Sequence, residues 1–318
     1  MATTLTKTKR APPLPPFPAA DESWQSTLGY AIPESEPDDL YPGEDDQPMA
    51  ETDKHQQVIS YCIAALAQYF KPVENEVYVA GNNFLYFRPH TATQKPKKVS
   101  PDVYVVRGIA QNPPRDSYKV WRENGRLPSV VIEITSTKTA KQDTGAKLAL
   151  YEQTLKVPEY FLFDPTGGYL NPTLRGYRLD ASRTYQMIPV TPLASGNRLY
   201  SEELGLYLVG RFDHTLRFLN PLEGKYLLTL DEAITVSENE AVRAEAETRR
   251  AEAEGRRAEA EARRADEEAR RADEATRLAE ELAVQVARER ERAETANAEF
   301  LAEIARLRAM IRAEGDGT

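Results

Sequence analysis

The spacing of apolar residues predicts a helix followed by several strands in the middle of the chain. Between Asp53 and Phe70 the apolar side chains recur every three or four residues, which is the spacing of one helix face. Short apolar runs follow, and the AGNN sequence between the first two is typical of a turn. These runs predict strands at VENEVYV, FLYFR, PDVYVV, 130–134 and 159–163.

A second helix is predicted from about Ala140 to Leu155, with Leu148, Tyr151 and Leu155 toward the core. Further strands are predicted around 174–179, 184–188 and 206–219. Because strands precede and follow this helix, the pattern favours an α/β fold.

The pattern changes from about residue 238, where RRAEAEG, RRAEAEA, RRADEEA and RRADEAT form a seven-residue repeat. Small residues hold two positions of the repeat, and the same register reaches Phe300, Ile304, Leu307 and Ile311. Apolar positions at this spacing with charged flanks are typical of a coiled coil, with pairing strongest near the end. A lone helix held by Glu–Arg pairs, or a partly disordered segment, fits the alanine-rich part equally well.

Composition divides the chain of 318 residues into three parts. Residues 1–50 are rich in proline and acidic residues, which predicts a disordered tail. Residues 51–230 have the pattern of a globular domain, and residues 231–318 that of a long C-terminal helix, a coiled coil if it pairs. The formal net charge is -9, which disfavours diffuse binding to nucleic acid.

Several classes of protein are disfavoured. No apolar run is long enough for a transmembrane helix, and the N-terminus lacks the apolar stretch of a secretory signal, so we expect a cytoplasmic protein. The single cysteine excludes an internal disulfide framework and a cysteine zinc site, and three scattered histidines make a histidine metal cage unlikely to form. The phosphate-binding glycine motifs, GxSxG and HExxH are all missing.

Two acidic residues at strand ends are the candidate chemistry. Asp102 begins one predicted strand, and Glu133 lies inside the apolar strand VVIEI. A carboxylate there is costly to bury without a partner, a proton or a metal. Two carboxylates converging from neighbouring strands suit Mg²⁺, which activates water and offsets the charge of a phosphate. The alternative is that Glu133 pairs with a lysine in the core or caps a neighbouring element.

The sequence resembles a known family over about residues 40–220. The matching segments are LYPGEDDQPMAETDKHQ, GNNFLYF, SPDVYVV, PSVVIEITS, DTGAKLALYEQTLKVPEYFLFDP and LRGYRL. They resemble the Uma-two family of restriction-endonuclease-like proteins, within the PD-(D/E)XK nuclease superfamily. The resemblance implies a restriction-endonuclease-like core, a mixed central sheet flanked by helices, and an endonuclease that uses Mg²⁺ or Mn²⁺ to hydrolyse DNA phosphodiester bonds.

The resemblance also implies roles for individual residues. Asp102 and Glu133 match the two metal-binding acids, which makes both catalytic and metal-ligating. Thr135 stands where the superfamily pattern has lysine, a departure from it. The family's own D…K…Y pattern matches Asp143, Lys147 and Tyr151, so Lys147 becomes the expected catalytic lysine.

Further residues are weaker candidates for the site. The spacing of four places Asp143, Lys147 and Tyr151 on one helix face, where Lys147 either reaches the site or pairs with Asp143 at the surface. Lys138 is a second lysine candidate in a polar loop. Glu51 either joins the metal site or favours the N-terminus of the first helix through its dipole, which we prefer. His55 is interpreted as a structural or helix-surface residue.

The distribution of basic residues predicts which partners the protein binds. Eleven basic residues gather around the proposed site, with Tyr104, Tyr118 and Trp121 among them: Lys95, Lys97, Lys98, Arg107, Arg115, Lys119, Arg122, Arg126, Lys138, Lys141 and Lys147. We expect phosphate contacts from this set, hence DNA as partner, and a homo-oligomer through the C-terminal helix. The alternative function is a non-catalytic nucleic-acid-binding or scaffolding protein with a degenerate nuclease fold, which Thr135 favours.

Overall fold

The computed structural model describes residues 40–42, 52–73 and 76–315. By internal contacts the chain divides into two units, Met1–Val236 and Ser237–Thr318. The expected acidic tail and Glu51 lie outside the described residues, apart from the short piece at 40–42. No helix in the described part is long and apolar enough to cross a membrane.

A six-stranded mixed sheet forms the centre of the first unit, in the order β1-β4-β6-β7-β8-β9. Only β6 and β7 run parallel, and every other neighbouring pair is antiparallel. Its strands are β1 (Val77–Ala80), β4 (Val103–Arg107), β6 (Val130–Ile134), β7 (Glu159–Phe163), β8 (Leu174–Leu179) and β9 (Tyr185–Met187). The β6 and β7 bounds are those that the apolar runs predict.

Two smaller sheets complete the strands of the described chain. The five-stranded one is antiparallel and contains β10 (Thr191–Leu193), β11 (Gly196–Ser201), β12 (Leu206–Arg211), β13 (Leu216–Asn220) and β14 (Lys225–Tyr226). The three-stranded one contains β2 (Phe84–Arg88), β3 (Lys97–Val99) and β5 (Ser117–Lys119). Short 3-10 turns follow α2 and β5, as η2 (Lys71–Val73) and η3 (Val120–Arg122).

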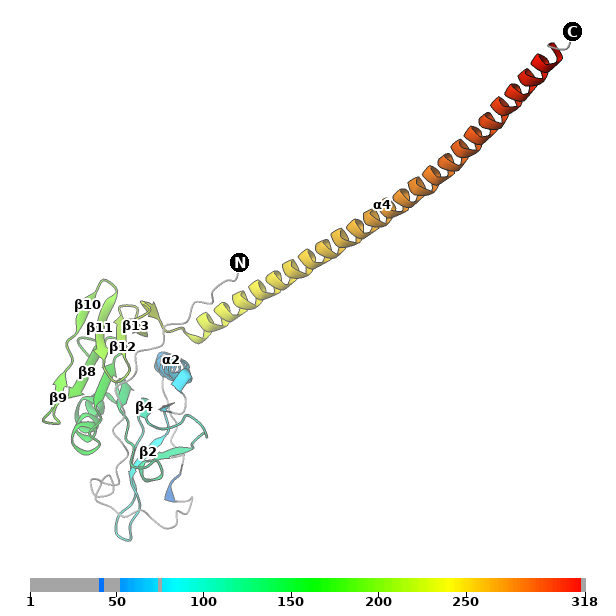
Figure 1. The fold of residues 1–318 in the computed structure, drawn as a ribbon. Helices are drawn as coiled ribbons and strands as arrows, with labels where there is room; N and C mark the ends of the chain where they lie inside the picture. The colour runs from blue at the N-terminus through cyan, green and yellow to red at the C-terminus, as the bar shows by residue number, and fades with distance from the viewer. Residues whose placement is uncertain (1–39, 43–51, 74–75, 316–318) are drawn as a thin grey trace. The chain divides into compact units, whose positions relative to one another are not determined.

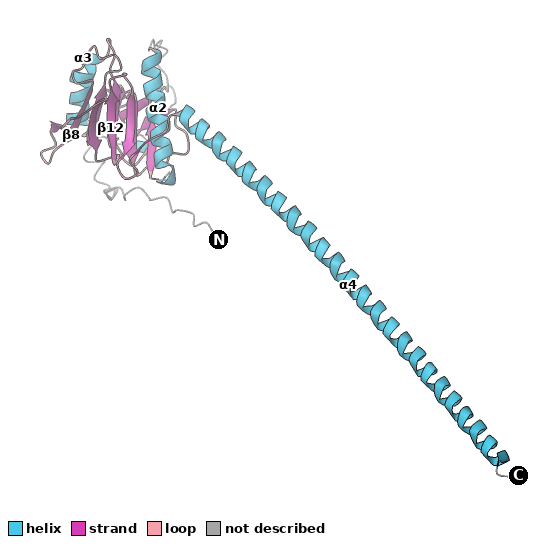
Figure 2. Ribbon diagram, turned by 90° about the horizontal axis from the view of Figure 1, so that it is seen from above, coloured by secondary structure: helices cyan, strands magenta, loops and turns pink. Residues whose placement is uncertain are grey.

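Helix α2 (Asp53–Phe70) covers one face of the central sheet, as the helical spacing predicts (Figures 1 and 2). Its buried side chains include Ile59, Cys62 and Leu66, which pack in one core with Val103 and Ile132 of the sheet. The even-numbered residues of β6 face this core because successive side chains of a strand point to opposite faces.

The opposite face of the sheet is covered by the helical segment after β6 (Figure 2). This segment begins as α3 (Ala140–Gln142) and continues through two π-helical stretches, η4 (Asp143–Lys147) and η5 (Leu150–Thr154). Tyr151 and Leu155 pack there with Val131 and Leu162. The predicted helix from 140 to 155 is therefore present, but its winding is not the regular α-helical winding that the sequence pattern assumes.

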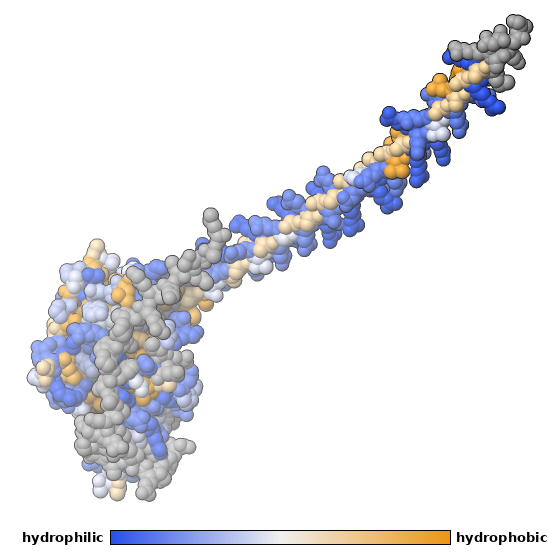
Figure 3. Space-filling view, in the orientation of Figure 1, coloured by the Kyte–Doolittle hydropathy of each residue, from blue (hydrophilic) through white to orange (hydrophobic). Residues whose placement is uncertain are grey.

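Helix α4 (Leu230–Gly315) is continuous over 86 residues, about 130 Å at 1.5 Å per residue. Ion pairs between residues four apart, such as Asp266–Arg270 and Arg277–Glu281, run along it. Most of its surface is hydrophilic, with hydrophobic side chains toward its C-terminal end, where Phe300 is 65% exposed (Figure 3). The long helix is thus confirmed, whereas its pairing stays a prediction.

Candidate active site

The register between β4 and β6 brings Asp102 and Glu133 together. Val103 pairs with Ile132 in this antiparallel ladder, so the next position along it sets Asp102 beside Glu133. The backbone N–H of Asp102 donates to Glu133 Oε2 at 3.4 Å, and Asp102 Oδ2 accepts from the backbone N–H of Ile134 at 2.6 Å. The two acids predicted from the strand ends are neighbours at one end of the sheet.

The turn before β2 leaves room for this arrangement because it contains Gly81. A Cβ atom built on Gly81 would lie 2.0 Å from the carbonyl oxygen of Asp102. The next residue, Asn82, donates its backbone N–H to the carbonyl of Pro101 at 3.0 Å. Only glycine permits so close an approach of the two backbones, and the approach fixes the segment that carries Asp102.

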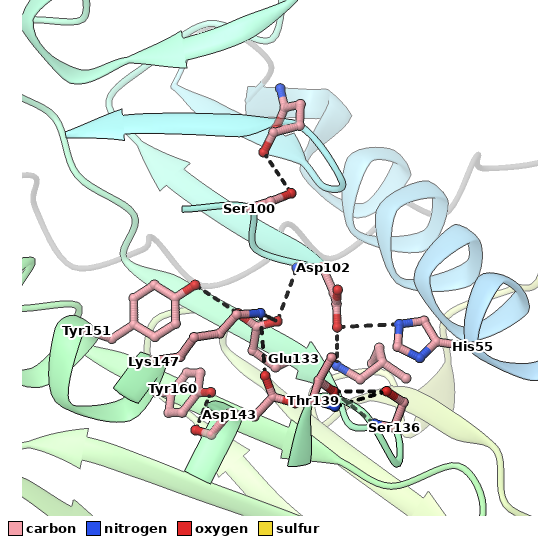
Figure 4. A network of polar contacts seen from close by, with 12 residues as sticks. His55, Ser100, Asp102, Glu133, Ser136, Thr139, Asp143, Lys147, Tyr151 and Tyr160 are labelled. Atoms are coloured by element: carbon pink, nitrogen blue, oxygen red, sulfur yellow. Dashed lines mark hydrogen bonds and ion pairs between the residues drawn. The ribbon is translucent and has the colours of Figure 1, made fainter. Parts of the chain in front are cut away.

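The helical segment after β6 adds Lys147 and Tyr151 to the two acids (Figure 4). Lys147 Nζ lies 2.8 Å from Glu133 Oε2, and the Tyr151 hydroxyl donates to Glu133 Oε1 at 2.8 Å. Asp143 Oδ1 lies 3.4 Å from the same ammonium. Lys147 therefore contacts both Glu133 and Asp143, and its pair with Asp143 is buried and not at the surface.

Burial sets the electrostatics of this group. Glu133 is 0% exposed, and burial raises its pKa from 4.5 to about 8, against the lowering effect of Lys147 and with further raising by Asp102 and Asp143. Burial alone would lower the pKa of Lys147, but the neighbouring carboxylates, Glu133 first, outweigh it and raise that pKa above its ordinary value. Lys147 accordingly carries its charge at neutral pH.

Asp143 is a fully buried carboxyl whose charged partner is the ammonium of Lys147, 3.4 Å from its Oδ1. Burial raises its pKa, and Lys147 partly opposes this. The π-helical winding holds Asp143 inward, where its backbone carbonyl also accepts from the Tyr160 hydroxyl at 2.9 Å. A buried carboxylate is costly without a charged partner, so the contact with Lys147 makes Asp143 part of the same buried network as Glu133.

His55 lies on the other side of Asp102, with Nε2 3.6 Å from Asp102 Oδ2 (Figure 4). Its imidazole is buried rather than on the helix surface, so the surface alternative is wrong. The signal was present in the sequence, because His55 is four residues before Ile59 and seven before Cys62, on the apolar face of the helix.

Two further candidates lie close to the site in sequence. Thr135 is buried, and its backbone N–H donates to the carbonyl of Phe163 at 2.8 Å. Its hydroxyl has no hydrogen-bond partner. Lys138 is exposed in the loop after β6.

The basic and aromatic residues proposed for phosphate contact are less available than the sequence indicates. Arg107 pairs with Glu203 at 2.9 Å and Arg115 with Glu123 at 2.5 Å. Tyr104, Tyr118 and Trp121 are buried, so their rings cannot stack on a nucleotide. Arg107, Arg115 and these three aromatic residues are therefore poor candidates for the phosphate contacts that the sequence predicts.

The donor chemistry of the site fits a magnesium-type ion. No group of three or more histidine, cysteine, aspartate or glutamate side chains within the described ranges could hold a metal. Mg²⁺ is commonly bound through one or two carboxylates and keeps several waters, so Asp102 and Glu133 meet its ligand preference. Three carboxyl groups against the single ammonium of Lys147 leave a surplus of negative charge for such a cation when they are ionised.

Comparison with known proteins decides the family. The profile of Uma2, described as "Putative restriction endonuclease", matches residues 39–208, more than half of the chain. The chain belongs to the Uma2 family. Its restriction-endonuclease-like core, expected from the sequence, is the central sheet with α2 and the π-helical segment on its faces.

Comparisons with solved structures and with curated proteins do not extend this assignment. One solved structure, titled as "a putative nuclease belonging to DUF820 from Anabaena variabilis ATCC 29413", is 15% identical and covers 46% of this chain and 74% of that chain, with a TM-score of 0.32. No curated protein matches the chain.

Proposed function

We propose that this Uma2 protein is an endonuclease that uses Mg²⁺ or Mn²⁺ to hydrolyse DNA phosphodiester bonds. One observation carries the proposal, the 2.8 Å contact of the Lys147 ammonium with Glu133 beside Asp102. Two carboxylates suit a hard cation that activates water, and a nearby ammonium stabilises the charge that develops on a phosphate. Family membership supports the nuclease class.

Each residue has a distinct part in the proposed reaction. Asp102 and Glu133 would hold the cation, which supplies a Lewis acid and an activated water when bound. Lys147 stabilises the negative charge that develops on the phosphate. Tyr151 fixes the orientation of Glu133 through its hydrogen bond, and Asp143 holds Lys147 from the other side.

The departure at Thr135 is compatible with this assignment. A lysine at that position would extend from the residue directly after β6, whereas Lys147 reaches Glu133 from the following helical segment. The charge that Thr135 does not supply is therefore supplied from another element. Lys138 is exposed in a loop and is the weaker candidate.

The alternative is a non-catalytic nucleic-acid-binding or scaffolding protein. It is favoured by the fact that both oxygens of Glu133 are already hydrogen-bonded, to Lys147, Tyr151 and the Asp102 N–H, so that the group is a self-contained buried network. Such a network also specifies a fold without catalysis.

A nuclease assay separates the two functions. The full chain is incubated with single-stranded, duplex and supercoiled DNA in Mg²⁺, Mn²⁺ or EDTA, beside Glu133→Gln. Glu159→Gln is the matched control, because Glu159 is also a buried carboxyl but pairs with Arg178 at the other end of β7. We expect metal-dependent cleavage by the wild type and the Glu159→Gln variant and none by Glu133→Gln. Calorimetry with Mn²⁺ should show binding lost in Glu133→Gln; unchanged affinity there would sink the metal assignment.

The proposal also covers the three parts of the chain and its assembly. Residues 1–50 serve as an acidic tail, residues 51–230 carry the site, and residues 231–318 associate with a second copy through the last third of α4. The exposed side chains of Phe300, Leu301 and Leu307 support this pairing zone. The cytoplasm, where DNA would be accessible, is the proposed location.

A further inference from the structure

Two loops leave the central sheet next to the proposed site. β6 and β7 are parallel neighbours that end together, with Ile134 paired to Phe163. The loop 135–139 therefore starts two residues after Glu133, and the loop 164–170 starts beside it. Loops at the ends of neighbouring parallel strands lie at the same edge of the sheet.

Asp164 fixes the second loop from within. Its carboxylate is 0% exposed and accepts hydrogen bonds from Thr166, Gly167, Tyr169 and Leu170 at 2.6–2.9 Å. Burial would raise the pKa of Asp164, but these donors outweigh it and lower that pKa. The negative charge of Asp164 is therefore taken up by the loop itself and does not face solvent.

The first loop is fixed in a similar way. The backbone N–H of Ser136 donates to Thr139 Oγ1 at 3.0 Å, and Ala140 N–H donates to the Ser136 carbonyl at 2.9 Å. This turn leaves Lys138 exposed. The hydroxyls of Thr137 and Tyr169 are hydrogen-bonded to each other, which joins the two loops.

The joined loops present a distinctive surface. Lys138 and Lys141 are exposed, and the ring of Tyr169 is 39% exposed. Among residues 135–142 and 164–170 the only acidic residue is the buried Asp164. In a chain with a net charge of -9 this is a locally basic surface with an accessible aromatic ring and a rigid backbone.

We propose that these two loops, residues 135–139 and 164–170, together with Lys141 in α3, form a docking platform for the sugar–phosphate backbone of the DNA strand that is cut. Lys138 contacts a phosphate, and Tyr169 offers its ring to a sugar or an unstacked base. The inference rests on the proposed nuclease function and adds the surface that holds the substrate. Because the platform binds the ground state and the transition state alike, it sets KM rather than turnover.

Two variants at Gly168, which differ in charge but not in shape, test the platform. A Cβ atom on Gly168 would meet only Thr166 Oγ1 within 4 Å, at an ordinary 3.5 Å, so a side chain can start there without a clash. Gly168→Glu places a negative charge beside Tyr169, and Gly168→Gln has nearly the same shape without the charge. Binding to labelled single-stranded and duplex oligonucleotides is measured by fluorescence anisotropy in EDTA, where metal-dependent cleavage is silent.

We expect Gly168→Glu to weaken binding about tenfold at low salt and Gly168→Gln to stay within about twofold, because like charge opposes the phosphate. Lys138→Gln should lower the slope of log affinity against log salt by roughly 0.7–0.9, the value for one lost phosphate contact. Tyr169→Leu should weaken binding about tenfold, whereas Tyr169→Phe, which keeps the ring, should not. In Mg²⁺, Lys138→Gln should raise KM and leave kcat unchanged.

The outcomes distinguish the platform from the nuclease function. Equal affinity of Gly168→Glu and Gly168→Gln in a wild-type background that binds and cuts DNA would overturn the platform and leave the nuclease intact. Binding without cleavage, with the Gly168 difference present, would support the platform and the binding alternative. Absence of both binding and cleavage in the wild type would overturn both proposals.

Discussion

Replacement of Glu133 by glutamine should change how the stability of the protein depends on pH. Burial raises the pKa of Glu133 to about 8, whereas in the unfolded chain it returns to 4.5. Between these two values the folded protein holds a proton that the unfolded chain has released. Glutamine has nearly the same shape but does not titrate, so the substitution removes this difference.

The sign and size follow from proton linkage. Because Glu133 holds its proton longer in the folded state, its contribution to the free energy of unfolding is largest below pH 4.5 and falls as the pH rises toward 8. One carboxyl contributes at most about 1.4 kcal/mol per pH unit, so the contribution of Glu133 should fall by roughly 2–3 kcal/mol between pH 5.5 and 7.5. The raised pKa of Lys147 lies above this window and does not contribute to it.

Urea unfolding in EDTA at the two pH values measures the effect, with the fluorescence of the buried Trp121 as the signal of the globular unit. We expect the Glu133→Gln variant to lose about 2–3 kcal/mol less than the wild type over the window. Mg²⁺ should flatten the wild-type dependence, because a bound cation favours the ionised carboxylate, and should leave the variant unchanged. Identical pH dependence of the two proteins in EDTA would refute the electrostatic reasoning.

Three other predictions concern separate parts of the molecule. Lys147→Ala should lower the cleavage rate about a hundredfold with little change in DNA or Mg²⁺ affinity, as measured in single-turnover and binding assays; wild-type cleavage would contradict its role. Gly81→Ala should destabilise the protein by about 2 kcal/mol or more in urea unfolding and weaken Mn²⁺ binding in calorimetry, because the new methyl group displaces Asp102. Gly145→Ala is the control: its methyl group would meet nothing within 4 Å, so neither stability nor Mn²⁺ binding should change. Deletion of residues 237–318 should leave a folded, smaller assembly in sedimentation experiments, and a strictly monomeric full-length chain at high concentration would refute pairing through α4.

The central elements could be predicted because their apolar patterns are strong and local. α2, β6 and β7 have the predicted bounds, and the acids at the ends of β4 and β6 do meet. β10 and β11 were missed, since their short, polar sequences carry no clear alternation and depend on pairing with β12.

Side-chain availability was harder to predict than secondary structure. Tyr104 and Tyr118 are interleaved with basic residues in sequence, but strand alternation turns their rings into the core. The partner of Arg107, Glu203, is 96 residues away and invisible to local reasoning. The spacing of four placed Lys147 correctly beside Asp143, yet the π-helical winding that buries Asp143 has no signature in a 3.6-residue period.

The packing of α2 also allows local opening of the protein to be measured at a native side chain. Cys62 is the only cysteine of the chain, and it is 0% exposed where α2 meets the sheet. Burial, with a smaller effect of Asp102, raises the pKa of its thiol, so the closed form resists alkylation. Reaction with a thiol reagent requires α2 to lift, which would also carry His55 away from Asp102. The rate at which Cys62 is labelled thus measures how often α2, which borders the candidate site, separates from the sheet.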